Sequence, residues 1–135
     1  MNWKLIFQLS LFGLAMAIAT ISWIPQKIEP VFWLIVVLLC AYIIAKKCSG
    51  KYFLHGFLLS LVNCIWITGL HTLFSSTYMA NHPEMVQMSA NWPLSKHPRI
   101  QMLITGPFFG VAFGIIMGLF AFIASKLVKK PLAMS

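Results

Sequence analysis

Five polar side chains within one apolar segment are the residues best placed to do chemistry. They are Ser60, Asn63, Cys64, Thr68 and His71, all in the run 52–74. At 100° per residue they fall within an arc of about 140° on a helix. Polar groups are costly in hydrocarbon, so this polar stripe should face other helices or a wet cavity. It could line a solute path or a buried polar site, or it could supply hydrogen bonds between helices.

The composition of the spans favours hydrogen bonds between helices. Proton- and cation-coupled transporters usually carry an ionisable side chain within a span, and the charge-free intervals that hold the four apolar runs contain no Asp, Glu, Lys or Arg. The two acidic residues, Glu29 and Glu84, lie in the segments between spans.

Side chains able to bind a metal collect in the segment 75–98 and just before it. Thioether and imidazole groups would suit Cu(I), but their spacing matches no ligand motif. The group consists of His71, Met79, His82, Glu84, Met85, Met88 and His97. No metal or other cofactor is therefore predicted.

No catalytic set is visible either, although His71 or His82 with Glu84 could act as acid–base groups. The chain is not predicted to be an enzyme.

Four glycines recur every four residues in the last apolar run: Gly106, Gly110, Gly114 and Gly118. Consecutive GxxxG steps let another helix backbone approach closely. The partner helix could belong to the same chain, which we favour, or to a second copy or another membrane protein.

Charge and hydropathy define the elements that position these residues. Of 135 residues, 60% are hydrophobic and 9% are charged, and the mean hydropathy is +0.87. Four long charge-free intervals each hold an apolar run of a length suited to a bilayer about 30 Å thick. We predict an all-α membrane protein, a single domain over 1–135 with spans at about 5–24, 31–47, 52–74 and 100–125. The spans should form an antiparallel bundle.

The basic residues predict the orientation. With both termini inside, the inner segments hold seven basic residues: Lys4, Lys46, Lys47, Lys51, Lys126, Lys129 and Lys130. The outer segments hold three: Lys27, Lys96 and Arg99. This is the positive-inside pattern, and it explains the net charge of +8 without nucleic-acid binding.

The first 19 residues resemble a signal peptide, but the apolar run continues to Ile24, which favours a retained span.

The segment 75–98 is the only long connection, and we expect it outside. Asn81, Pro83 and Glu84 predict the start of a short helix that continues to about Asn91. Met85, Met88 and Trp92 would share one face, as in a helix that lies in the membrane interface.

The stretches NHPE (Asn81–Glu84) and GPFFGVAFG (Gly106–Gly114), with the four spans, resemble small bacterial membrane proteins of unknown function. The resemblance implies the bacterial inner membrane and assigns no functional residue. Small multidrug transporters share the size but place a Glu in the first span, where this chain has Gln8.

We therefore expect a non-enzymatic integral membrane protein that binds or supports a partner. The alternative is a small channel or transporter that uses the polar stripe. The expected surroundings are the lipid bilayer and a second copy or a membrane protein at the glycine face.

Overall fold

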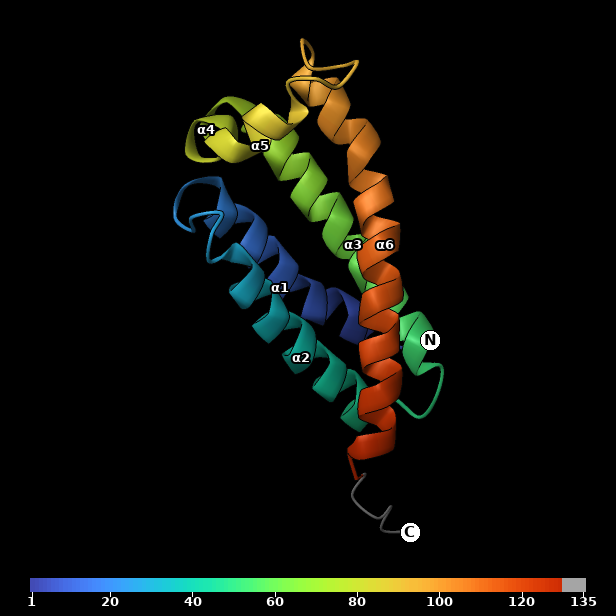
Figure 1. The fold of residues 1–135 in the computed structure, drawn as a ribbon. Coiled ribbons are helices and arrows are strands. Elements are labelled where there is room, and N and C mark those ends of the chain that lie inside the picture. Colours follow the sequence, from blue (N-terminus) through green and yellow to red (C-terminus); the bar gives the residue numbers. More distant parts are fainter. Residues whose placement is uncertain (130–135) are drawn as a thin grey trace.

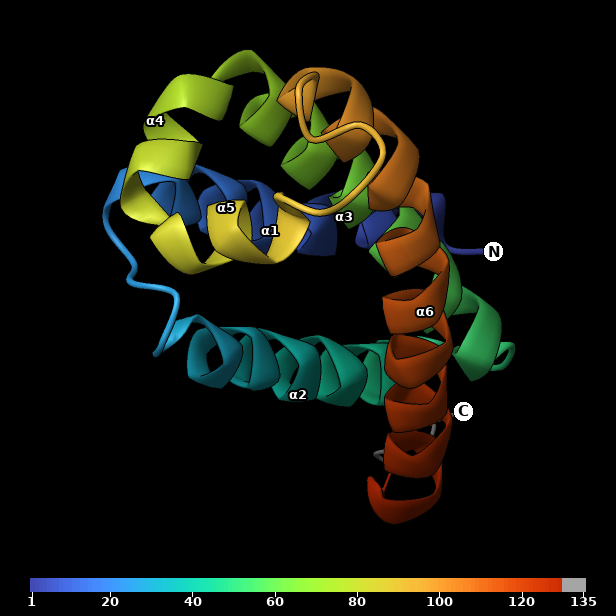
Figure 2. The same cartoon turned by 45° about the horizontal axis from the view of Figure 1, so that its top comes forward.

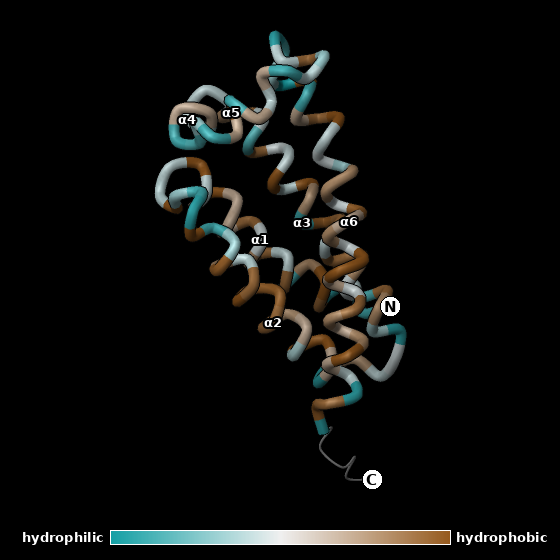
Figure 3. Tube along the Cα trace, viewed as in Figure 1, coloured by the Kyte–Doolittle hydropathy of each residue, from teal (hydrophilic) through white to brown (hydrophobic). Residues whose placement is uncertain are grey.

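The computed structural model describes residues 1–129, and within them every regular element is a helix. The six helices are α1 (Trp3–Ser22), α2 (Glu29–Lys47), α3 (Tyr52–Leu73), α4 (Ser75–Asn81), α5 (Pro83–Ser89) and α6 (Pro98–Leu127). Four of them, α1, α2, α3 and α6, are long and apolar enough to cross a membrane. Figure 3 shows this apolar character along the four long helices and more hydrophilic residues around α4 and α5. Lys130 lies outside the described residues.

The helix ends follow from local capping. The Asn2 side chain accepts a hydrogen bond from the Leu5 backbone N–H at 3.1 Å, so α1 begins earlier than predicted. Pro30 and Pro98 stand in the first turns of α2 and α6, where a missing N–H costs no helical bond. Pro107 lies inside α6, and the helix continues past it.

The four long helices run alternately up and down and come closest at the end where the chain begins and ends (Figure 1). Toward the other end, which carries α4 and α5, they spread apart, as Figure 2 shows from above. We call these the terminal end and the α4–α5 end.

An apolar core holds the terminal end together. Ile6 of α1, Ile44 of α2 and Leu59 of α3 are essentially inaccessible, and Met117 and Ala121 of α6 pack with them. Each long helix therefore contributes to a single cluster. Dispersion contacts in such a cluster are among the forces that hold helices together inside a membrane.

The glycines of α6 pack against α3, within the same chain. A Cβ atom at Gly114 or Gly118 would overlap the ring of Phe57 or Phe53, at 2.8 and 2.7 Å. The closest backbone approach is at Gly56 of α3, where a Cβ would lie 2.6 Å from the Met117 carbonyl oxygen. A backbone atom cannot rotate away as a side chain can, so this crossing tolerates only glycine at position 56.

The connection from α3 to α6 contains the predicted short helix as α5, which begins at Pro83 and ends at Ser89. It also contains α4, which was not predicted. Asn81 ends α4, and its side-chain amide donates to the carbonyls of Thr77 and Ile21, at 2.9 and 3.2 Å. Because that side chain is bonded to one carbonyl of α4 and to one at the end of α1, it does not cap α5. His82 takes the position before α5, with Pro83 in its first turn.

The crossing of α3 and α6 predicts opposite effects for two glycines of one helix. Gly56→Ala should force the helices apart and lower the melting temperature of the detergent-solubilised protein clearly. Gly69→Ala, where nothing lies within 4 Å of the added methyl group, should be neutral or stabilising by up to about 1 kcal/mol, because alanine favours helix. Equal melting temperatures for the two variants would contradict the close approach.

Candidate functional site

The polar stripe of α3 divides between two neighbouring helices. Ser60 and Cys64 face α6: the Ser60 hydroxyl donates to the Gly110 carbonyl at 3.2 Å, and the Cys64 thiol donates to the Gly106 carbonyl at 3.1 Å. Thr68 lies one turn further, with its hydroxyl 3.6 Å from the Cys64 sulfur and its side chain against Gly106. These three residues sit over the glycines that the sequence singled out.

Asn63 and His71 face α1. The Asn63 side chain packs on Gly13, where a Cβ would lie 3.0 Å from the Asn63 Cβ. His71 Nε2 lies 3.0 Å from the Thr20 hydroxyl, which itself donates to the Ala17 carbonyl. Since that hydroxyl has one proton, His71 Nε2–H is the donor to Thr20. The five stripe residues therefore lie in two helix–helix contacts, which is the arrangement expected of interhelical hydrogen bonds.

The α4–α5 end is held by a polar cluster of five buried or half-buried residues. The rings of His71, Tyr78 and His82 form a stack, with successive centroids 4.1 Å apart. His82 faces Glu29 of α2, with 3.5 Å between Nε2 and Oε2. Thr20 completes the cluster through its contact with His71. Residues of α1, α2, α3 and α4 therefore meet here, at the end where the long helices spread apart.

His82 is the centre of the cluster and is fully buried. Its Nδ1–H donates to the Tyr78 carbonyl at 2.8 Å, and its Nε2 points at the Glu29 carboxylate. The Nε2–Oε2 distance of 3.5 Å is a close polar contact without hydrogen-bond geometry, so His82 Nε2 is buried with Glu29 as its nearest acidic group. The other Glu29 oxygen accepts a hydrogen bond from the Trp33 indole N–H at 3.1 Å.

Burial also changes the chemistry of Tyr78, which lies outside the long helices. Loss of hydration raises the pKa of its phenol to about 12, and the nearby Glu29 charge adds to the shift. The phenol is therefore a poor acid. At neutral pH the phenol therefore keeps its proton, and Tyr78 acts in the cluster as a packed ring between two histidines.

The sequence named His71 and His82 but suggested Glu84 as their acidic partner. In the structure Glu84 lies exposed in the first turn of α5, and Glu29 is the acidic residue that faces His82. One signal could have indicated the cluster: residues 71, 75, 78 and 82 repeat at helical spacing and all are buried or half-buried. Their face continues from α3 into α4 across the break at Phe74. Residues 1–129 contain no group of three His, Cys, Asp or Glu side chains able to hold a metal.

Fold and cluster together define an all-helical protein with four candidate membrane-spanning helices, as in a multi-pass membrane protein. No protein family matches the chain, and no curated protein or solved structure is significantly similar to it.

The His82–Glu29 pair predicts coupling between two helices distant in sequence. We expect Glu29→Gln and His82→Gln to be non-additive by about 0.5 kcal/mol or more in the free energy of unfolding, because they share one contact. Glu84→Gln in place of Glu29→Gln is the matched control and should add to His82→Gln without coupling. Unfolding in detergent micelles measures all the variants, and equal coupling for both acids would show that the ion pair is not the cause.

Tyr78 predicts a loss of stability in strong base. The folded state keeps the phenol proton to about pH 12, whereas the unfolded chain loses it near the ordinary pKa of 10. Ionisation therefore favours unfolding, so the stabilising contribution is present below pH 10 and is lost as the pH rises toward 12. In a phenolate absorbance titration, Tyr78→Phe should remove the component that titrates last. Removal of an early component instead would refute the assignment.

Proposed function

We propose that the chain is a non-enzymatic integral protein of the bacterial inner membrane that acts by binding a partner membrane protein. One observation carries the proposal: the polar residues of α3 are bonded to α1 and α6, as the Ser60, Cys64 and His71 contacts show. Polar groups that bond to neighbouring helices stabilise a bundle, and few polar groups of α3 then remain free to line a solute path. Recognition of another protein must then use the remaining surface, which is largely apolar.

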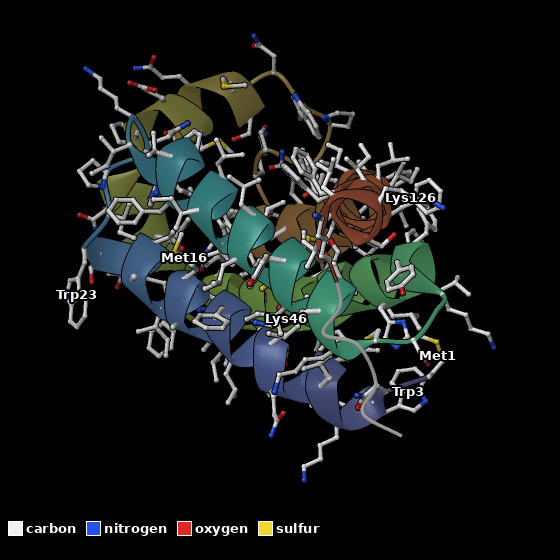
Figure 4. All side chains as sticks on the ribbon, turned by 90° about the horizontal axis from the view of Figure 1, so that it is seen from below. Met1, Trp3, Met16, Trp23, Lys46 and Lys126 are labelled. Atoms are coloured by element: carbon white, nitrogen blue, oxygen red, sulfur yellow. The ribbon has the colours of Figure 1, made fainter. Side chains whose placement is uncertain are left out.

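The orientation proposed has both termini inside. Lys4, Lys46, Lys51 and Lys126 belong to the terminal end, and Figure 4 looks onto that end with Lys46 and Lys126 labelled at the ends of α2 and α6. The positive-inside bias favours the cytoplasm for this end. Segment 75–98 would then be outside. Met85 and Met88, 37% and 69% exposed, support an interfacial position for α5.

The partner surface proposed is on α2, because α3 occupies the glycine face. The buried residues of α2 are Cys40, Ala41, Ile44 and Ala45, all in its second half. The first half packs least, yet the Trp33–Glu29–His82 contacts fix its start. Its exposed side chains include a continuous stripe at helical spacing, consisting of Val31, Ile35, Leu38 and Tyr42. A fixed apolar stripe suits one helix of a partner.

Photo-crosslinking in native membranes tests this surface. A photoreactive residue in place of Ile35 should give one discrete protein adduct, because the partner helix would lie against it. The control is the same residue in place of Ile123 of α6, whose exposure of 54% matches the 57% of Ile35. We expect no discrete protein adduct from position 123. Identical adducts from both positions, or none from position 35, would refute the proposed surface.

A channel or transporter is the second candidate, and one observation favours it. The side-chain oxygens of Asn63 and Thr72 on α3 are buried without a hydrogen-bond partner in the described structure. Such groups could contact water or a solute. A liposome flux assay separates the two functions: flux above that of empty vesicles, abolished by Asn63→Leu in folded protein, would support transport. We expect no such flux.

A further inference from the structure

Two hollows are lined by the first turns of α6, at the α4–α5 end, and the consecutive residues Ile100 and Gln101 belong to the first and the second. The first, of about 470 Å³, is lined by polar and basic residues that include Ser75, Ser76, Lys96, His97 and Arg99. The second, of about 290 Å³, is lined mainly by Trp92, Leu94, Ile104, Phe108 and Phe109, together with Gln101. A polar hollow beside an apolar one matches the two halves of an amphiphilic molecule.

The polar hollow is electrostatically suited to an anion. Among residues 1–129 no carboxylate lies within ion-pair distance of Lys96 or Arg99, since the single ion pair there is His82–Glu29. Arg99 is oriented by its Nε–H, which donates to the Ser75 hydroxyl at 3.2 Å. The N-terminus of α6 adds positive potential, because the backbone N–H groups of a first helical turn have no carbonyl within the helix.

Gln101 provides an independent indication of a ligand in the apolar hollow. Only 9% of Gln101 is exposed, and the residue lines this hollow. The described part of the chain offers its amide no hydrogen bond, although the Gln101 backbone carbonyl accepts one from Thr105. The amide lines the hollow and makes no hydrogen bond to the described residues, so it is available to a polar group of a ligand.

The depth of the site suits a lipid. The 30 residues of α6 span about 45 Å at 1.5 Å per residue, which exceeds a hydrocarbon core of about 30 Å. The first turns of α6 can therefore lie at the level of the headgroups, and Ile104, Phe108 and Phe109 would lie below them beside acyl chains.

We infer that this end of α6 binds one anionic phospholipid. Its phosphate occupies the polar hollow beside Lys96 and Arg99, a polar group of the glycerol region meets Gln101, and an acyl chain follows the apolar hollow. This site is separate from the α2 surface and does not depend on the protein's partner.

Native mass spectrometry of the purified full chain tests the site. The protein is equilibrated with phosphatidylglycerol or with phosphatidylcholine of identical acyl chains, and inorganic phosphate is added in a third arm. We expect one phosphatidylglycerol to be retained in preference to phosphatidylcholine. Lys96→Gln with Arg99→Gln should weaken retention roughly thirtyfold, since each basic residue near an anionic lipid surface contributes about fivefold.

Two further variants make the test specific. Lys27→Gln removes a basic residue outside both hollows and should leave retention unchanged. Gln101→Leu should weaken retention of phosphatidylglycerol while leaving any effect of inorganic phosphate unaltered. Equal binding of the two lipids, or an equal loss from Lys27→Gln, would overturn the proposal. Binding of inorganic phosphate without lipid retention would also overturn it, because it would show an anion site that takes no acyl chain. Melting temperatures close to that of the unaltered chain verify that each variant is folded.

Discussion

At Gly56 the backbone of α3 comes so near to that of α6 that an added Cβ would lie 2.6 Å from the Met117 carbonyl oxygen and 2.9 Å from the Gly118 Cα. Much of the bundle depends on this separation. It lets short side chains such as Ser60 and Cys64 reach carbonyls of α6. A larger distance between the two helix backbones would prevent these hydrogen bonds. It also places the Phe53 and Phe57 rings directly on Gly118 and Gly114. In a membrane, close packing of this kind substitutes for the hydrophobic effect that holds soluble helices together.

The two ends of the bundle are stabilised by different interactions. At the terminal end all four long helices share an apolar core around Ile44 and Leu59. At the α4–α5 end the helices spread apart, and a polar cluster around His82 connects them. A buried polar group is costly when no polar group lies near it, and the His82–Glu29 contact places a carboxylate of α2 against the buried ring at the α4–α5 junction. The lipid site proposed at α6 occupies the same end.

The sequence was sufficient to predict the four long apolar helices, because a long apolar run without charged residues is typical of a helix that crosses a membrane. It also predicted that the glycines of α6 mark a close helix contact and that polar residues of α3 lie near one another. The sequence could not show that the polar stripe divides between α1 and α6. The positions of residues around one helix do not reveal where the neighbouring helices lie. The Glu29–His82 pair was missed for the same reason: the two residues lie far apart in the sequence. Asn81 was misassigned because its amide bonds to Ile21, which no local motif reveals.

Thiol accessibility of Cys64 tests most directly the central claim that the stripe of α3 is packed within the bundle. The experiment uses membranes containing the full chain with Cys40→Ala and Cys48→Ala, so that Cys64 is the single thiol. A water-soluble maleimide should not label Cys64 until the protein is unfolded, because its sulfur lies against the Gly106 carbonyl. Ser76→Cys, at an exposed position in α4, serves as the labelled control with Cys64→Ala. Labelling of Cys64 in folded protein at the rate of that control would contradict the account and indicate a water-filled path along α3.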